Sequence, residues 1–117
     1  MDINNKMHGN KNLSKLKEIK KLERDWNGNK ARPIPKKVIE KVKTLILNLE
    51  IQPQIFPTAD DSIQIEYDGD NNSYLELQVT KGNELSYYEV DKSGKETTGS
   101  IPCSSFALNS LVEEFYK

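Results

Sequence analysis

The chain has 117 residues, of which 35% are hydrophobic and 30% charged, and its net charge is −1. This length suits one domain, and the composition is not that of a disordered chain. No apolar run approaches the about 18 residues that cross a bilayer, and the single cysteine, Cys103, rules out an intrachain disulfide. The amino terminus also has no hydrophobic segment typical of a secretory signal, so a cytoplasmic protein is expected.

Charge is distributed unevenly along the chain. Residues 1–44 contain 13 Lys or Arg against 5 Asp or Glu, a net charge of +8, whereas residues 45–117 contain 4 against 13, a net charge of −9. Such asymmetry indicates an electrostatic partner. It is equally compatible with two halves that complement each other within one fold or between copies.

Two amphipathic helices are predicted after a flexible polar arm at residues 1–11. The first begins at Asn12, a suitable N-cap, and ends at the Asn-Gly pair 27–28. Its apolar face recurs at spacings of three and four and comprises Leu13, Leu16, Ile19, Leu22 and Trp26. The second helix starts at Pro35 and ends before Pro53. It carries a broad apolar stripe, namely Val38, Ile39, Val42, Leu45, Ile46 and Leu49.

After the second helix the hydrophobic period changes to two, which predicts antiparallel β-hairpins. Three strands are separated by the turns DGDNN (68–72) and KGNE (81–84). Their apolar positions are Ile63, Ile65, Tyr67, Leu75, Leu77, Val79 and those of LSYYEV at 85–90. The segments QIFPTAD (54–60) and TTGSI (97–101) add up to two edge strands.

A final helix is predicted in SSFALNSLVEEFY, residues 104–116, with Leu108, Leu111, Val112 and Phe115 on one face. The expected fold class is therefore α+β: two N-terminal helices, an antiparallel sheet of three to five strands, and a C-terminal helix packed on one face. Residues 12–117 are expected to form a single domain.

An enzyme is not expected. The turn DGDNN begins like a calcium loop, but an EF-hand needs Gly and Glu at positions that hold Ser73 and Val79 here. The only Cys–His pair would be Cys103 with His8 in the polar arm, so Cys103 is interpreted as a small buried hydrophobe rather than a nucleophile. We therefore predict no catalytic residue, no cofactor and no metal.

The segment RDWNGNKARPIP, residues 24–35, contains the only tryptophan. Trp26 lies on the apolar face of the first predicted helix, Gly28 permits a turn, and Pro33 stiffens the connection to the second helix. A structural role for Trp26, as a plug that sets the angle between the helices, is favoured over a role as an exposed recognition residue.

Two surfaces are candidates for binding a partner. One is an acidic, tyrosine-rich sheet face that would occlude a basic protein surface, comprising Glu66, Tyr67, Asp68, Tyr74, Glu76 and Tyr87. The alternative is a basic helical surface that would follow a nucleic-acid backbone, comprising Lys17, Lys20, Lys21, Arg24, Lys37 and Lys41. An outer sheet face that is merely solvated, with its tyrosines in the core, is the third interpretation.

Several residues occur in an order that is similar to a known group: Trp26-Asn27-Gly28, Ala31, Pro33, Ile34, Pro53, Pro57 and SIQIEYD at 62–68. The set resembles small bacterial proteins of no established activity, which have a Trp-Asp/Asn-Gly…Ala-x-Pro helix junction followed by an Ile-x-Leu-Glu-Trp-like strand. The match covers about residues 13–80, and Tyr67 stands where the group often has Trp. The resemblance implies a common fold, a structural Trp26, and a setting in mobile elements, prophages and toxin–antitoxin-like loci.

The expected function is protein binding without catalysis. We predict an inhibitor of antitoxin, immunity or anti-defence (anti-CRISPR-like) type that occludes a basic surface of a nuclease or another nucleic-acid-binding protein. The alternative is a nucleic-acid-binding regulator that uses the basic helices. No membrane is expected as a partner, and pairing of two copies as a homodimer is left open.

Overall fold

The computed structural model describes residues 3–117, with side chains from residue 11 onward. This part contains three α-helices and one five-stranded antiparallel sheet, whose strands lie side by side in chain order. The elements are α1 (Ile3–Lys20), α2 (Lys36–Asn48), β1 (Gln54–Pro57), β2 (Ile63–Asp68), β3 (Tyr74–Val79), β4 (Glu84–Val90), β5 (Glu96–Pro102) and α3 (Ser105–Phe115). The predicted α+β class, the hairpins, both edge strands and the C-terminal helix are confirmed.

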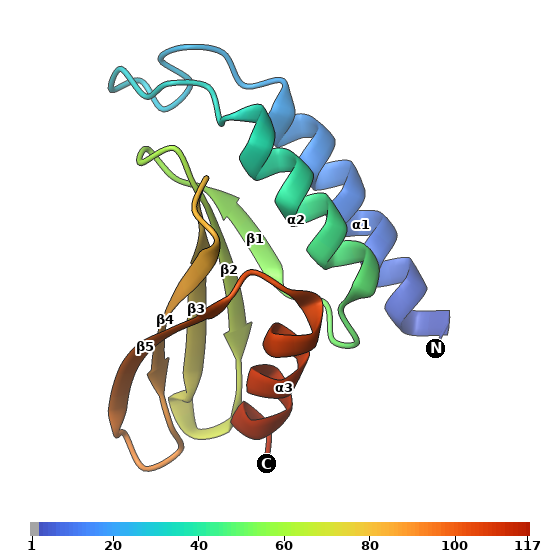
Figure 1. Cartoon of the computed structure of the whole chain (residues 1–117), viewed down its shortest axis with the longest axis vertical. Helices are drawn as coiled ribbons and strands as arrows, with labels where there is room; N and C mark the ends of the chain where they lie inside the picture. Colours follow the sequence, from blue (N-terminus) through green and yellow to red (C-terminus); the bar gives the residue numbers. More distant parts are fainter. Residues whose placement is uncertain (1–2) are drawn as a thin grey trace.

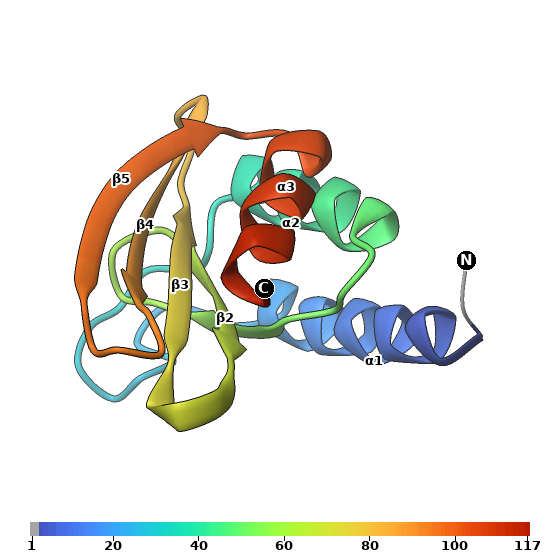
Figure 2. The ribbon, with the colours of Figure 1, turned by 90° about the horizontal axis from the view of Figure 1, so that it is seen from below.

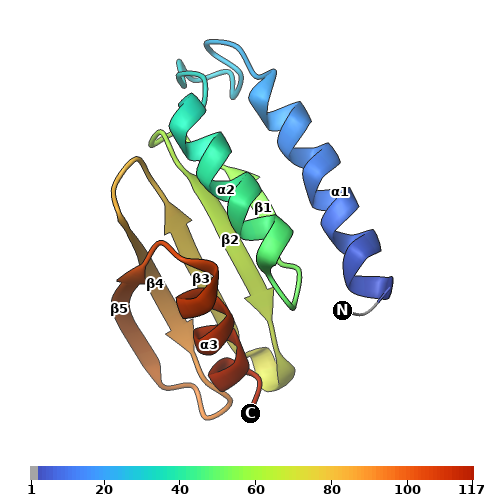
Figure 3. The ribbon, with the colours of Figure 1, turned by 45° about the vertical axis from the view of Figure 1, so that its right-hand side comes forward.

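The helices form one layer and the sheet forms the other (Figures 1 and 2). α2 and α3 cover the sheet, and α1 packs along α2 and beside β1 (Figure 3). Apolar side chains of both layers are withdrawn from solvent at their interface, including Val38, Val42, Ile65, Leu77 and Leu108. Among the described residues, no helix covers the opposite side of the sheet, which we call the helix-free face.

Strand register decides which side chains reach each face. Ile65 lies opposite Ile55 on one side and Leu77 on the other, and Leu77 lies opposite Tyr87. This row points toward the helices, because its aliphatic members are fully buried. Successive side chains alternate between the faces, so Glu66, Glu76 and their neighbours in the next row point to the helix-free face.

The first helix differs from its prediction, since it begins at Ile3 rather than at Asn12. Residues 3–11, expected as a flexible polar arm, form its first half, and residues 1–2 of that arm lie outside the described part. Asn12 is not an N-cap: it is 8% exposed, and its Nδ2 donates to Gln52 Oε1 (3.0 Å) and to the Pro53 carbonyl (2.9 Å). The predicted N-cap was wrong because a polar residue before an apolar run can also lie inside a helix and form a buried hydrogen bond.

The first helix also ends earlier than expected, at Lys20, so Trp26 lies in the connection to α2 and not on a helix. Its ring is half-buried against the core, and its Nε1 donates to the Arg32 carbonyl over 2.8 Å. Two further bonds close the loop, from the Asp25 amide to the Ala31 carbonyl (2.7 Å) and from the Gly28 amide to the Asp25 carbonyl (2.9 Å). Trp26 therefore fastens a compact loop to the core.

The loop explains why Asn27 and Gly28 occur together. Asn27 Oδ1 accepts from the amides of Asn29 (2.9 Å) and Ala31 (3.1 Å), which is the side-chain chemistry that favours Asn in turns. Gly28 has φ = +71°, a conformation that side chains disfavour. Pro33 follows this loop and precedes α2, whose N-cap is Pro35.

Crossing a bilayer would require a longer or more apolar helix than any in the described residues.

Candidate functional site

The helix-free face is acidic. Strands β1 to β5 contain no Lys or Arg at any position. The outward positions of β2 to β5 carry the carboxylates Glu66, Asp68, Glu76, Glu84 and Glu96, together with the phenols Tyr74 and Tyr88. The face therefore offers hydrogen-bond acceptors and negative charge without a neutralising strand residue.

The centre of this face is a pair of carboxylates bridged by a phenol. Glu66 and Glu76 lie directly opposite each other on β2 and β3. The Tyr74 hydroxyl donates to Glu66 Oε1 over 2.6 Å and also reaches Glu76 Oε2 at 3.3 Å. Burial, followed by the hydrogen bond to Glu66, raises the pKa of Tyr74 well above its usual range. The phenol thus stays protonated and shares its one proton between two charged acceptors.

A second phenol–carboxylate pair lies toward the sheet edge. The Tyr88 hydroxyl donates to Glu96 Oε1, and this bond is the main reason that the pKa of Tyr88 is raised. Glu84 accepts a bond from the Ser100 hydroxyl over 3.0 Å. These carboxylates are held in place and remain exposed, so their second oxygens are available to a cationic side chain of a partner.

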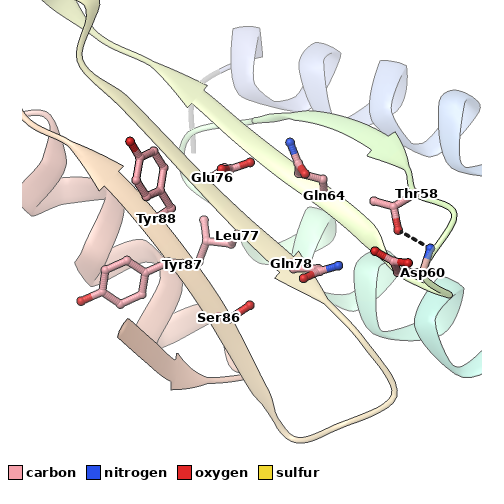
Figure 4. A pocket seen from close by; sticks show the side chains of 9 residues that line it. All are labelled: Thr58, Asp60, Gln64, Glu76, Leu77, Gln78, Ser86, Tyr87 and Tyr88. Atoms are coloured by element: carbon pink, nitrogen blue, oxygen red, sulfur yellow. Dashed lines mark hydrogen bonds between the residues drawn. The ribbon is translucent and has the colours of Figure 1, made fainter. Parts of the chain in front are cut away.

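Between these groups the face is hollowed into a shallow depression of about 300 Å³ (Figure 4). It is lined by Thr58, Asp60, Gln64, Glu76, Leu77, Gln78, Ser86, Tyr87 and Tyr88. Gln78 is oriented by a bond from its Nε2 to Ser62 Oγ over 2.8 Å. Carboxylates on both sides of amide groups and an aromatic ring form a lining that suits a lysine or arginine side chain.

Two of the predicted acidic-face residues point the other way. Tyr67 is 3% exposed on the helix-covered face, where its hydroxyl donates to the Ile51 carbonyl over 2.8 Å and burial raises its pKa. Tyr87 is half-buried on the same side, because it pairs with Leu77. The assignment of Tyr67 to the acidic face is wrong, and the side chain of Tyr87 turns toward the helices although the residue also lines the depression, whereas Glu66, Asp68, Tyr74 and Glu76 do share the helix-free face.

The structure does not bring the predicted basic residues into one surface. Lys37 and Lys41 border a depression between α2 and Cys103, whereas α1 packs along the other flank of α2 (Figure 3). Lys41 Nζ donates to the carbonyls of Lys81 and Gly82, so it is engaged within the fold. Lys17, Lys20, Lys21 and Arg24 are exposed on α1 and the loop that follows it.

The remaining candidates from the sequence have structural surroundings. The DGDNN segment connects β2 to β3 through a short 3₁₀ turn, Asp70–Asn72, as a hairpin connection should. Cys103 is free, half-buried and packed against the core. The side chain of His8 lies outside the described ones. Among the described side chains, no group of three His, Cys, Asp or Glu is placed to hold a metal ion.

Sequence reasoning missed Glu84 and Glu96, which extend the acidic face toward the edge, and the depression residues Gln64 and Gln78. The signal was present, because alternation from the buried Leu85 places Tyr87 inward and Tyr88 outward. Alternation within IQIEYD likewise separates Glu66 from Tyr67.

The chain matches no protein family model, and neither a curated protein nor a solved structure is significantly similar to it.

Proposed function

We propose that this protein is a binding module without catalytic activity, an inhibitor of antitoxin, immunity or anti-defence type that acts in the cytoplasm and occludes a basic surface of another protein. The observation that supports the proposal is the charge of the helix-free face. Its strands carry Glu66, Asp68, Glu76, Glu84 and Glu96 and no Lys or Arg. A face of one sign complements a surface of the other, steers association and rejects acidic competitors.

The central carboxylate pair supports a binding role more specifically. Like charges directly opposite each other destabilise an antiparallel strand pair. Glu66 and Glu76 nevertheless face each other, with only the proton of Tyr74 between them. A lysine or arginine of a partner inserted beside this pair would relieve the repulsion and gain charge-assisted hydrogen bonds. The partner we propose is accordingly a nuclease or another protein with a basic nucleic-acid-binding surface.

The alternative is a nucleic-acid-binding regulator that uses the basic helices, and the net charge of +8 on residues 1–44 favours it. Its basic side chains are divided between two flanks of α2, and Lys41 is already bonded to carbonyls. Binding through such a scattered set would be weak and would fall steeply with salt.

The test is affinity capture from the lysate of the native host, with and without nuclease, using the wild-type chain and two charge-matched double variants. Glu66→Lys/Glu76→Lys reverses the centre of the acidic face. Glu23→Lys/Glu113→Lys makes the same change at two exposed positions that lie outside the strands. We expect a basic protein that survives nuclease and is retained about tenfold less by the first variant only.

Two results would contradict the proposal. Equal capture by both variants would show that the acidic face does not carry binding. Capture that disappears with nuclease would favour the nucleic-acid alternative. Circular dichroism of each variant checks that the fold is intact.

A further inference from the structure

The two edges of the sheet are covered differently. α1 lies beside β1, whereas β5 forms the opposite edge and no described element lies against its outer side (Figures 1 and 3). Every residue of β5 except Ile101 is exposed. Natural proteins protect such edges with charged side chains (above all lysine), prolines or bulges. In β5 the only charged residue is the first, Glu96, the only proline is the last, and the register with β4 is unbroken.

The backbone of β5 is ready to pair. The Asp91 amide donates to the Lys95 carbonyl and the Cys103 amide to the Asn83 carbonyl, each over 2.9 Å. These two bonds lie at the two ends of the β4–β5 ladder, so they fix which residue pairs of the ladder are hydrogen-bonded and which are not. Even-numbered residues of β5 therefore direct their amides and carbonyls away from β4. The free edge presents the amides of Glu96, Thr98 and Ser100, and no described group bonds to them.

The side chains that border this edge differ between the two faces. On the helix-free face are Glu96 and, one strand further in, Glu84. On the other face the Tyr87 ring crosses Gly99 so closely that a Cβ there would lie 2.8 Å from its Cζ and Oη. An added strand would thus meet carboxylates on one side and an aromatic ring with Ile101 on the other.

We propose that β5 receives an extended segment of the partner protein as a sixth strand, with basic residues at its outward positions and apolar residues at its inward ones. Only the basic charge of the partner rests on the proposed function; the pairing rests on the backbone. A second copy of this chain is a poorer occupant, because pairing β5 with β5 would join two acidic faces whose strands contain no Lys or Arg. Main-chain bonds would supply affinity and alternate side chains specificity.

The test uses a fluorescently labelled peptide of alternating lysine and valine, as long as β5, titrated by anisotropy. Thr98→Pro removes an outward amide and leaves the ladder to β4 unchanged. Thr98→Val keeps the amide at similar size and is the matched control. We expect about tenfold weaker binding by Thr98→Pro and none of this loss for Thr98→Val. If Thr98→Pro fails to fold, Ser100→Pro with Ser100→Ala repeats the comparison.

Four outcomes would overturn the proposal. The first is that the peptide shows no saturable binding, and the second is that the proline variant and its control bind it equally. The third is that a peptide whose central valine is replaced by proline binds as tightly as the original peptide. The fourth is that the wild-type chain forms a dimer that Thr98→Pro dissociates. The last would make a second copy the occupant. The variant Glu66→Lys/Glu76→Lys separates the two proposals, since it changes the centre of the acidic face and leaves the backbone of β5 intact.

Discussion

Asn12 ties α1 to the connection between α2 and β1, and replacing it with aspartate tests that contact with the smallest change of shape. Its two donated bonds, to Gln52 Oε1 and the Pro53 carbonyl, would be replaced by a carboxylate facing two acceptors. Gln52 cannot turn to compensate without losing its own bonds to the carbonyls of Ile46 (2.9 Å) and Leu49 (3.2 Å). Each lost bond is worth about 0.5–1.5 kcal/mol and each buried unsatisfied group costs about 1–3 kcal/mol. We expect Asn12→Asp to lower the free energy of unfolding by about 2–4 kcal/mol at neutral pH.

The loss should depend on pH. Burial beside acceptors raises the pKa of the new carboxyl in the folded state above its unfolded value of about 3.9. Below that value the group is protonated in both states and can donate one bond, so the deficit is smallest there. It grows to its full size as the pH rises through the raised folded pKa. Urea unfolding at about pH 4 and pH 7, compared with the wild-type chain at each pH, measures it.

The control is Asn83→Asp, the same chemical change at an exposed position of the β3–β4 turn, with an expected effect within about 0.5 kcal/mol. A deficit of that small size for Asn12→Asp, or one that does not change with pH, would refute the argument that Asn12 is a buried donor.

Two further predictions concern the faces of the sheet. Gly99→Val should lower the free energy of unfolding by about 1–3 kcal/mol, because the new side chain displaces the Tyr87 ring; urea unfolding measures this loss. The control is Ser100→Val, since the side chain of residue 100 lies on the helix-free face. Equal losses for the two variants would contradict the close contact between Gly99 and Tyr87. Glu66→Gln should lower the pKa of Tyr74, because it removes a charged acceptor of the phenol. The pKa of Tyr74 should still lie above the usual range, because the phenol remains buried to the same extent. An NMR titration of the Tyr74 ring measures this, and an unchanged midpoint would contradict the bond to Glu66.

Periodicity predicted the centre of the sheet well because β2 and β3 each have one buried and one open side. The alternation in Ile63, Ile65 and Tyr67 continues into Leu75, Leu77 and Val79, and both hairpins follow from the turns between these strands. The beginning of α1 could not be predicted in the same way. Asn12 has the chemistry of an N-cap, and only its contacts with the distant Gln52 and Pro53 make it a buried residue.

The acidic face was predicted in part. Glu66 and Glu76 were placed correctly, since they alternate with buried aliphatic residues. Tyr67 and Tyr87 were misplaced because their amphipathic side chains suit a surface as well as a core, although alternation with the buried Ile65 and Leu85 directs both toward the helices. The depression could not be predicted at all, because it depends on how Asp60, in the β1–β2 loop, returns toward β3.

The chain order of the strands has a consequence for how the protein folds. Every strand pairs only with its neighbours in sequence, so closing each hairpin fixes a short loop and costs little entropy. The contacts within the sheet are therefore local in sequence, and local contacts favour fast folding. The helices require distant contacts instead: Asn109 on α3 bonds across the fold to the Asn48 carbonyl and the Glu50 amide. During synthesis α1 and α2 leave the ribosome before the strands do. The apolar side chains that these helices bury against the sheet therefore stay exposed until the sheet has been made.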